Sequence, residues 1–237
     1  MNDPFSEPSD SREEILKAAY GALCRYGYAD LTIQRIGGEF EKSPTLIYHH
    51  YGSKDELLID LLTYLLDDFE EAISAGSFDL PPRQRLLAYV RAMCDPSELN
   101  HEDAPDAPFL RAVVELRTQA THDPAYREHF DRSDRVFGRF LERSVREAAE
   151  ASESSTAGTD GDPAVDAGLD GGLGGEEVIT PSAVAGLIMT VASGGTFRWA
   201  TTSDRGWVTP TRDGIQRYVA LTLPRVVTED PSAPDSD

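Results

Sequence analysis

The sequence predicts an all-α fold, with an N-terminal three-helix unit followed by a larger helical bundle. Apolar residues recur every three or four positions along most of the chain, which is the period of an amphipathic helix. The apolar-polar alternation of a half-buried strand never persists. With 237 residues, 40% of them hydrophobic, the chain is long and apolar enough to bury a core.

The charge of the chain is strongly acidic and unevenly distributed. It holds 22 Lys and Arg against 42 Asp and Glu, a formal net charge of −20, and Lys17, Lys42 and Lys54 are its only lysines. Many acids with almost no lysine favour a halophilic protein, soluble in concentrated salt where charge repulsion is screened. Residues 11–58 nevertheless hold six bases and seven acids. This near-neutral segment indicates a surface that approaches a polyanion.

Several classes of protein are excluded by composition. Cys24 and Cys94 cannot build a disulfide scaffold and form no Cys-x-x-Cys pair for zinc, so we interpret them as packing residues, with redox sensing left open. The longest apolar run, 184–192, is far shorter than the ~20 residues of a membrane span. The first ten residues hold three acids and no base, unlike a secretory signal. We expect a cytoplasmic protein with no membrane segment, metal or cofactor.

The first two helices are bounded by recognisable caps. The first is expected to begin at Ser11, whose hydroxyl would form a capping box with Glu14. It should end at Gly27, since glycine favours the position just past a helix. A second, short helix is expected from its N-cap Thr32 to Phe40.

The turn before the third helix contains residues with special backbone requirements. Gly37 and Gly38 each cost roughly 1 kcal/mol inside a helix, which is tolerable if another backbone passes close by. Ser43 is expected to cap the third helix, with Pro44 in its first turn.

The third helix has two distinct faces. Ile47 and Tyr51 are four residues apart and are expected to point into the core. Thr45, Tyr48 and His49 lie on the opposite side and have no evident core role. Exposed aromatic residues on a short helix are uncommon without a partner, so this face is a candidate binding surface.

The rest of the chain also reads as helical. A long helix is expected after its N-cap Ser53, and further helices at 83–93, 108–121, 124–150, 181–202 and 211–226. The helix at 181–202 is apolar nearly all round, so it must be covered on more than one side. Its small residues Gly186, Ser193 and Gly194 let another helix approach closely, and we expect a second copy of the chain to cover it.

Residues 152–177 differ from the helical segments. They contain seven glycines, seven acids and no base, a composition that cannot bury enough surface to become ordered. Calcium binding is disfavoured because the aspartates lack the EF-hand spacing. We therefore expect a disordered insertion at 152–177, disordered tails at 1–10 and 227–237, a helix-turn-helix domain at 11–58 and a helical domain at 59–226.

Two stretches resemble the DNA-binding domain of TetR/AcrR-type transcriptional regulators. They are Thr-Ile-Gln-Arg-Ile-Gly at 32–37 and Ser-Pro-Thr-Leu-Ile-Tyr-His-His-Tyr-Gly-Ser-Lys-Asp-Glu-Leu-Leu at 43–58. The family has a Thr-capped helix, then Ser-x-x-x-Ile-Tyr-x-His-Phe-x-Ser-Lys-x-Glu-Leu, and the match covers about 48 residues. Phe40-Glu41-Lys42 stands where the family usually has Ala-Gly-Val, so a turn wound differently is expected and operator preference is not carried over.

The resemblance assigns DNA contacts to eight residues. Positions that contact phosphates in the family are matched by Thr32, Ser43, Tyr48, His50 and Lys54. Positions that reach base edges in the major groove are matched by Thr45, Leu46 and His49. Two further basic residues of this segment, Arg35 and Lys42, bring the set of candidate DNA contacts to ten. Thr32 and Ser43 would also serve as caps in any helical protein.

The leading hypothesis is a dimeric, ligand-responsive repressor that recognises a pseudo-palindromic operator. The implied partners are double-stranded DNA, a second copy bound through helices 181–202 and 211–226, and an unknown small-molecule effector. Effector-binding residues are not identifiable, and the larger aromatic residues of the bundle are interpreted as core. Weak counterion release at high salt predicts a DNA affinity that varies little with salt.

Two other functions stay open at this point. A constitutive or architectural DNA-binding protein would lack the effector. An all-helical enzyme is disfavoured because the His and carboxylate groupings outside the N-terminal unit have no metalloprotease spacing. These groupings are His101-Glu102-Asp103 and His122-Asp123 with His129. We therefore expect no catalytic residues and no enzymatic activity.

Overall fold

The computed structural model describes residues 5, 8–40, 42–76, 80–96, 107–156 and 179–227. Within these ranges the regular structure is helical, and extended pairing is limited to an isolated bridge between Ile179 and Val226. The prediction of an all-α fold is confirmed.

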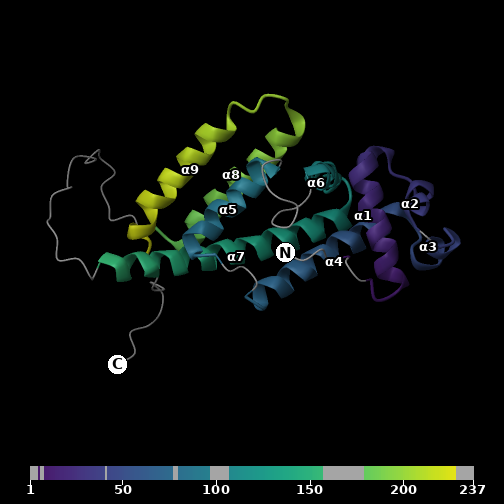
Figure 1. Ribbon diagram of the computed structural model, residues 1–237, viewed down its shortest axis with the longest axis horizontal. Coiled ribbons are helices and arrows are strands. Elements are labelled where there is room, and N and C mark those ends of the chain that lie inside the picture. The colour runs from purple at the N-terminus through teal and green to yellow at the C-terminus, as the bar shows by residue number, and fades with distance from the viewer. Residues whose placement is uncertain are drawn as a thin grey trace.

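The helices occupy nearly the expected segments. The N-terminal unit contains α1 (Ser11–Asp30), α2 (Ile33–Glu39) and α3 (Thr45–His50). They are followed by α4 (Lys54–Ser74), α5 (Pro82–Cys94), α6 (Ala107–Gln119) and α7 (Pro124–Thr156). The last helices are α8 (Pro181–Thr201) and α9 (Val208–Thr222), with a 3-10 turn at Leu223–Arg225. In Figure 1, α1–α3 lie at one end of the molecule, and α8 and α9 lie toward the other.

The helix α1 begins at Ser11, as predicted, but its N-cap lies one residue earlier than the sequence predicted. Asp10, not Ser11, is the N-cap, and its Oδ1 accepts a hydrogen bond from the Glu13 N–H at 2.9 Å. The Glu13 carboxylate in turn accepts one from the Ser9 N–H at 2.6 Å. The predicted capping box of Ser11 and Glu14 is therefore wrong, since the cap is Asp10 and the Glu13 carboxylate bonds the residue before that cap. An aspartate cap is among the best helix N-caps, and its charge also suits the positive end of the helix dipole.

The C-terminal part of α1 is interrupted at Gly27. This residue has φ +68° and ψ 171°, so the regular helix stops there, as predicted, and a short turn from Tyr28 to Asp30 follows. Positive φ is costly for residues with a Cβ, which explains glycine at this position.

The turn between α2 and α3 is tightly packed. A Cβ built on Gly37 would lie 3.0 Å from Cβ and 3.1 Å from Cγ of Pro44, so a close approach is found there, but to a proline ring rather than to a backbone. The expectation of a close approach is wrong for Gly38, where an added Cβ would have nothing within 4 Å. The helix α3 begins at Thr45 with Pro44 as N-cap, so the Ser43 cap is displaced by one residue. Ser43 Oγ still accepts a 3.4 Å hydrogen bond from the Thr45 N–H.

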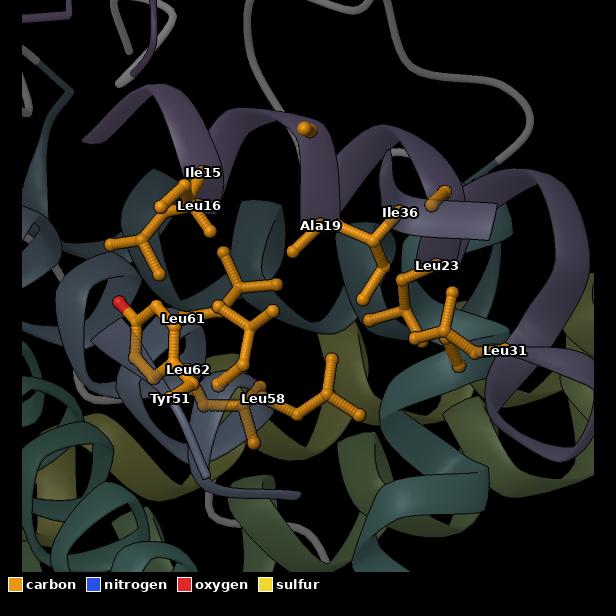
Figure 2. Packing of buried hydrophobic residues seen from close by; sticks show 14 of the residues in the cluster. Ile15, Leu16, Ala19, Leu23, Leu31, Ile36, Tyr51, Leu58, Leu61 and Leu62 are labelled. Atoms are coloured by element: carbon orange, nitrogen blue, oxygen red, sulfur yellow. The ribbon is translucent and has the colours of Figure 1, made fainter. Parts of the chain in front are cut away.

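Two buried apolar clusters organise the fold. The first joins α1–α4 and includes residues of α6 and α7 such as Leu116 and Tyr126. Figure 2 shows side chains of α1, α2 and α4 packed together there, among them Ile15, Leu16, Ala19, Leu23, Ile36, Leu58, Leu61 and Leu62. The second cluster joins α5, α7, α8 and α9. Since each buried Leu or Ile side chain stabilises by about 1.5–3 kcal/mol, these clusters fix the N-terminal unit on the rest of the chain.

Several sequence expectations concern segments at the edge of the described residues. Phe5 belongs to the tail expected to be disordered, yet its side chain is only 3% exposed. The helix α7 continues to Thr156, into the expected insertion at 152–177. Four parts of these expectations lie outside the described residues, namely 157–178, the tail from 228 onward, Glu41 and the grouping at 101–103. None of the helices in the described ranges is long and apolar enough to cross a membrane.

Candidate nucleic-acid interface

The short helix α3 presents a polar face at the surface. Ile47 is fully buried and Tyr51 is 6% exposed, both in the first apolar cluster. Thr45 and His49 are exposed, and Tyr48, one of the few exposed large apolar side chains in the described part, is 57% exposed. The division into a core face and an outward face therefore follows the spacing seen in the sequence.

A charged network attaches α3 to α1 and α4. The Tyr51 hydroxyl donates a 2.6 Å hydrogen bond to Asp60 of α4. Arg12 of α1 donates two hydrogen bonds to the same carboxylate, at 2.8 and 2.6 Å. Burial pushes the pKa of Asp60 upward, but these hydrogen bonds outweigh it and hold the pKa below its ordinary value. The carboxylate therefore stays ionised and fixes the end of α3.

The basic side chains among the candidate residues already have partners within the chain. The Arg35 guanidinium lies 4.7 Å from the centre of the Tyr26 ring and donates to the Asp30 carbonyl. Lys42 pairs with Glu14 of α1. Both contacts hold these side chains against α1.

Lys54 is engaged at the N-terminus of α4. Its Nζ donates a 3.1 Å hydrogen bond to the Tyr28 carbonyl and lies 4.0 Å from the centre of the Tyr28 ring. The remaining bases of residues 11–58 are also paired: Arg12 with Asp60, Lys17 with the Phe5 carbonyl, and Arg25 with Glu39. All six bases of this segment thus have a partner within the chain.

The other candidate residues are placed differently. Thr32 is exposed and its Oγ1 accepts a hydrogen bond from the Arg35 N–H at 3.2 Å, so it is a cap whatever else it does. Ser43 and His50 are exposed. Leu46 is half-buried and packs against the first apolar cluster, which leaves only part of its side chain available. The candidates come together on α2, α3 and the turn between them, at one end of the molecule (Figure 1).

Sequence reasoning missed a polar network at the start of α4. Asp55 accepts hydrogen bonds from the Tyr28 hydroxyl at 3.0 Å and from the Tyr126 hydroxyl at 2.9 Å. Burial, and then the Asp55 carboxylate, raise the pKa of Tyr28 to about 12. The network joins α1, α4 and α7. Its members are far apart in the sequence, and no spacing could have predicted their contact.

The described histidines and cysteine outside the N-terminal unit have different surroundings. His122 is exposed, whereas His129 is 8% exposed, with Nδ1 3.5 Å from Thr63 Oγ1. Burial raises the pKa of Cys94 to about 11, so its thiol is protonated and unreactive. Among the described residues, no group of three or more His, Cys, Asp or Glu side chains could hold a metal ion.

A second exposed face runs along α8 and α9. The outward stripe of α8 consists of small and apolar residues at helical spacing, namely Ala183, Gly186, Leu187, Thr190, Ser193, Gly194 and Phe197. Leu187 is 42% and Phe197 is 56% exposed, and Leu221 of α9 is 62% exposed. The other side of α8 packs into the second apolar cluster. One side of this apolar helix is therefore uncovered by the part of the chain that the structure describes.

The known proteins that the chain is similar to are transcriptional regulators. The family model of bacterial regulatory proteins of the tetR family matches residues 15–61. The chain is 26% identical over 121 residues to the transcriptional repressor AcnR of Corynebacterium glutamicum, covering 51% of this chain and 56% of that protein. It spans about half the length of the curated relatives it matches.

Solved structures extend the likeness to most of the chain. A TetR transcription regulator from Haloarcula marismortui is 26% identical, with a TM-score of 0.65 over 90% of this chain and 98% of that one. A transcriptional regulator from Saccharomonospora viridis in complex with choline shares the fold, with 19% identity, a TM-score of 0.59 and coverage of 94% and 100%. With the motif match at α2 and α3, these similarities show a fold shared with TetR regulators and an N-terminal segment, residues 15–61, that matches the tetR family.

Proposed function

We propose that this chain is a transcriptional repressor that binds a DNA operator as a homodimer and releases it in response to a small-molecule ligand. The observation that carries the DNA-binding part is the outward face of α3. Thr45, Tyr48 and His49 are exposed there, while Ile47 and Tyr51 hold the helix from behind. A short helix supported in this way can enter the major groove.

The proposed contacts follow the chemistry of each side chain. Thr45 and His49 carry short donors and acceptors that can reach base edges, and the exposed part of Leu46 can meet a thymine methyl group. Hydroxyl and imidazole groups suit phosphate oxygens, so backbone contacts are assigned to Thr32, Ser43, Tyr48 and His50. Arg35, Lys42 and Lys54 would have to be shared between phosphate and their present partners within the chain.

Dimerisation is supported by the uncovered stripe of α8. Gly186 and Gly194 have nothing within 4 Å of an added Cβ, so the backbone is open to another helix. Leu187 and Phe197 beside them would be buried by a second copy. Two copies paired through α8 and α9 would present two α3 helices, and half-sites on DNA lie about 34–36 Å apart. The dimer would therefore read a pseudo-palindrome.

Because its basic side chains are paired within the chain, the protein is predicted to have an unusual salt dependence of DNA affinity. Affinity for DNA normally depends on lysines and arginines that displace counterions, with a slope of about −0.9 per phosphate contact. Since all six bases of residues 11–58 have partners within the chain, few counterions would be released. We propose that binding varies with salt far less than the slope of about −10 of a strongly basic repressor. This suits a cytoplasmic protein that works in concentrated salt.

Ligand response is supported by the shared fold alone. The Saccharomonospora viridis regulator binds choline within a chain of the same architecture. A ligand that fits one spacing of the two N-terminal units better than another would shift the population away from the DNA-competent state. No residue of an effector site is assigned, and the proposed repressor has no catalytic role.

The proposal is tested by selecting DNA from a random pool with the full chain. Recovered sequences should contain an inverted repeat. His49→Ala should weaken binding of the selected DNA about tenfold and relax preference at one position of each half-site. His122→Ala is the matched control, since it removes an exposed histidine that is not among the candidate DNA contacts and should bind as wild type. Failure to enrich any sequence, or equal loss in both variants, would refute the proposed function.

A further inference from the structure

Phe5 lies outside the helices yet is buried between them. Its side chain is 3% exposed. The ring lies 5.3 Å from that of Tyr64 in α4, measured between centroids, with an interplanar angle of 18°. It also lies 5.6 Å from the ring of Tyr20 in α1. One residue from the N-terminal segment therefore fills the junction of two helices.

The contacts of Phe5 continue into a third helix. The Tyr20 ring lies 5.0 Å from that of Phe109 in α6, so four rings follow one another from α4 through Phe5 to α1 and α6. The Phe5 backbone is fixed as well, because Lys17 Nζ donates a 2.9 Å hydrogen bond to its carbonyl. Offset and tilted ring pairs at these distances have preferred orientations, so they define the angle between the helices as well as their contact.

This arrangement is not required by the family match. The match covers residues 15–61, and Phe5, Tyr64 and Phe109 all lie outside it. The helix α1 contacts both α4 and α6, and α2 and α3 share the first apolar cluster with it. A change in the seating of α1 would thus move the whole outward face of α3.

We propose that Phe5 is a positioning residue, which fixes α1 on α4 and α6 and so sets where the N-terminal unit stands relative to the rest of the protein. Its consequence for DNA rests on the proposed function. A dimer gains affinity for a full operator only when both α3 helices reach their half-sites together. Loose N-terminal units would lose that gain while each still binds a single half-site.

The geometric part is tested without DNA. Spin labels are placed in the full chain at two exposed positions, Gln34→Cys in α2 and Arg135→Cys in α7, with Cys24→Ser in every sample. Labelled chains are diluted with unlabelled chains, so that distances within one protomer dominate. Phe5→Ala should broaden the distance distribution, and Phe5→Leu, which restores most of the apolar volume, should broaden it less.

Phe140→Ala is the matched control, because Phe140 is a buried ring (6% exposed) in the second apolar cluster, away from this junction. It should destabilise the protein without broadening the distribution. An unchanged distribution in Phe5→Ala, or equal broadening in Phe140→Ala, would overturn the proposal.

The DNA part compares a selected full operator with one half-site. Phe5→Ala should lower affinity for the full operator about tenfold and for the half-site less than about twofold, because only bivalent binding needs a fixed spacing. Equal loss on both would overturn the positioning role. If the wild-type chain selects no DNA, the proposed function fails, while the distance measurement still decides the role of Phe5.

Discussion

The Glu115 carboxylate of α6 accepts a hydrogen bond from the backbone N–H of Tyr28, 2.8 Å away, directly after the break in α1. The same oxygen accepts a second, at 3.3 Å, from the Ala29 N–H. A charged acceptor from another helix thus satisfies backbone groups that the interruption at Gly27 releases. The end of α1 is held by a residue 86 or 87 positions away in the sequence.

Replacing Glu115 should therefore destabilise the protein. Glu115→Ala leaves two backbone donors without this acceptor, and we expect a loss of about 1–2 kcal/mol in the free energy of unfolding. Glu115→Gln keeps an acceptor oxygen and should lose less than half as much. Urea unfolding at fixed protein concentration measures both, and equal losses would show that charge, not hydrogen bonding, is what matters.

Two glycines of α1 should respond in opposite directions to alanine. Gly27→Ala forces a residue with a Cβ into positive φ and places that Cβ 3.2 Å from Glu115 Oε1, so a loss of about 1–2 kcal/mol is expected. Gly21→Ala is the control, because it lies within the helix with nothing within 4 Å and should gain about 0.5–1 kcal/mol. Thermal unfolding midpoints should shift downward for the first and upward for the second.

The contrast between these positions shows what could be predicted from sequence. Local signals placed the break at Gly27 and the two faces of α3, because caps and helical spacing act over a few residues. The partners of Tyr28 could not be predicted, since Glu115 and Tyr126 are brought to it only by packing of α6 and α7. Phe5 was missed for the same reason. A lone aromatic residue in a polar segment gives no sign of the two helices whose junction it fills.

The glycine pair in α2 separates packing from helix propensity. Gly37→Ala would press a Cβ against the Pro44 ring and displace the start of α3, costing about 1–3 kcal/mol. Gly38→Ala meets nothing within 4 Å and should be neutral or slightly stabilising. Operator binding should fall in Gly37→Ala alone. A Gly38→Ala variant that binds equally poorly would mean that the surface of α2, not its packing on Pro44, controls binding.

His129 should make stability depend on pH between about 6.5 and 4. Burial, and then the positive charge of Arg132, lower its pKa from 6.5 to about 4, against a smaller opposing effect of Asp67. The unfolded chain therefore binds a proton in this range that the folded chain does not, and stability falls as pH falls, by about 2–3 kcal/mol across the range. His129→Gln should flatten this part of the profile, whereas His122→Gln at an exposed position should leave it unchanged.

The exposed stripe of α8 predicts how the assembly can be broken. Phe197 is 56% exposed and lies on the same outward face as Leu187 and Gly194. A charge there costs little in an isolated chain, because the side chain is already in contact with water, but it would be buried without a partner at a helix-helix interface. Phe197→Glu should therefore weaken dimerisation at least about tenfold while leaving the helix content unchanged. Sedimentation equilibrium measures the dissociation constant, and circular dichroism measures helix content.

Leu80→Glu, at a 45% exposed leucine outside this stripe, is the control and should dimerise as wild type. A Phe197→Glu chain that sediments like wild type would place the contact between copies elsewhere, and the spacing argument for a pseudo-palindromic operator would fall with it.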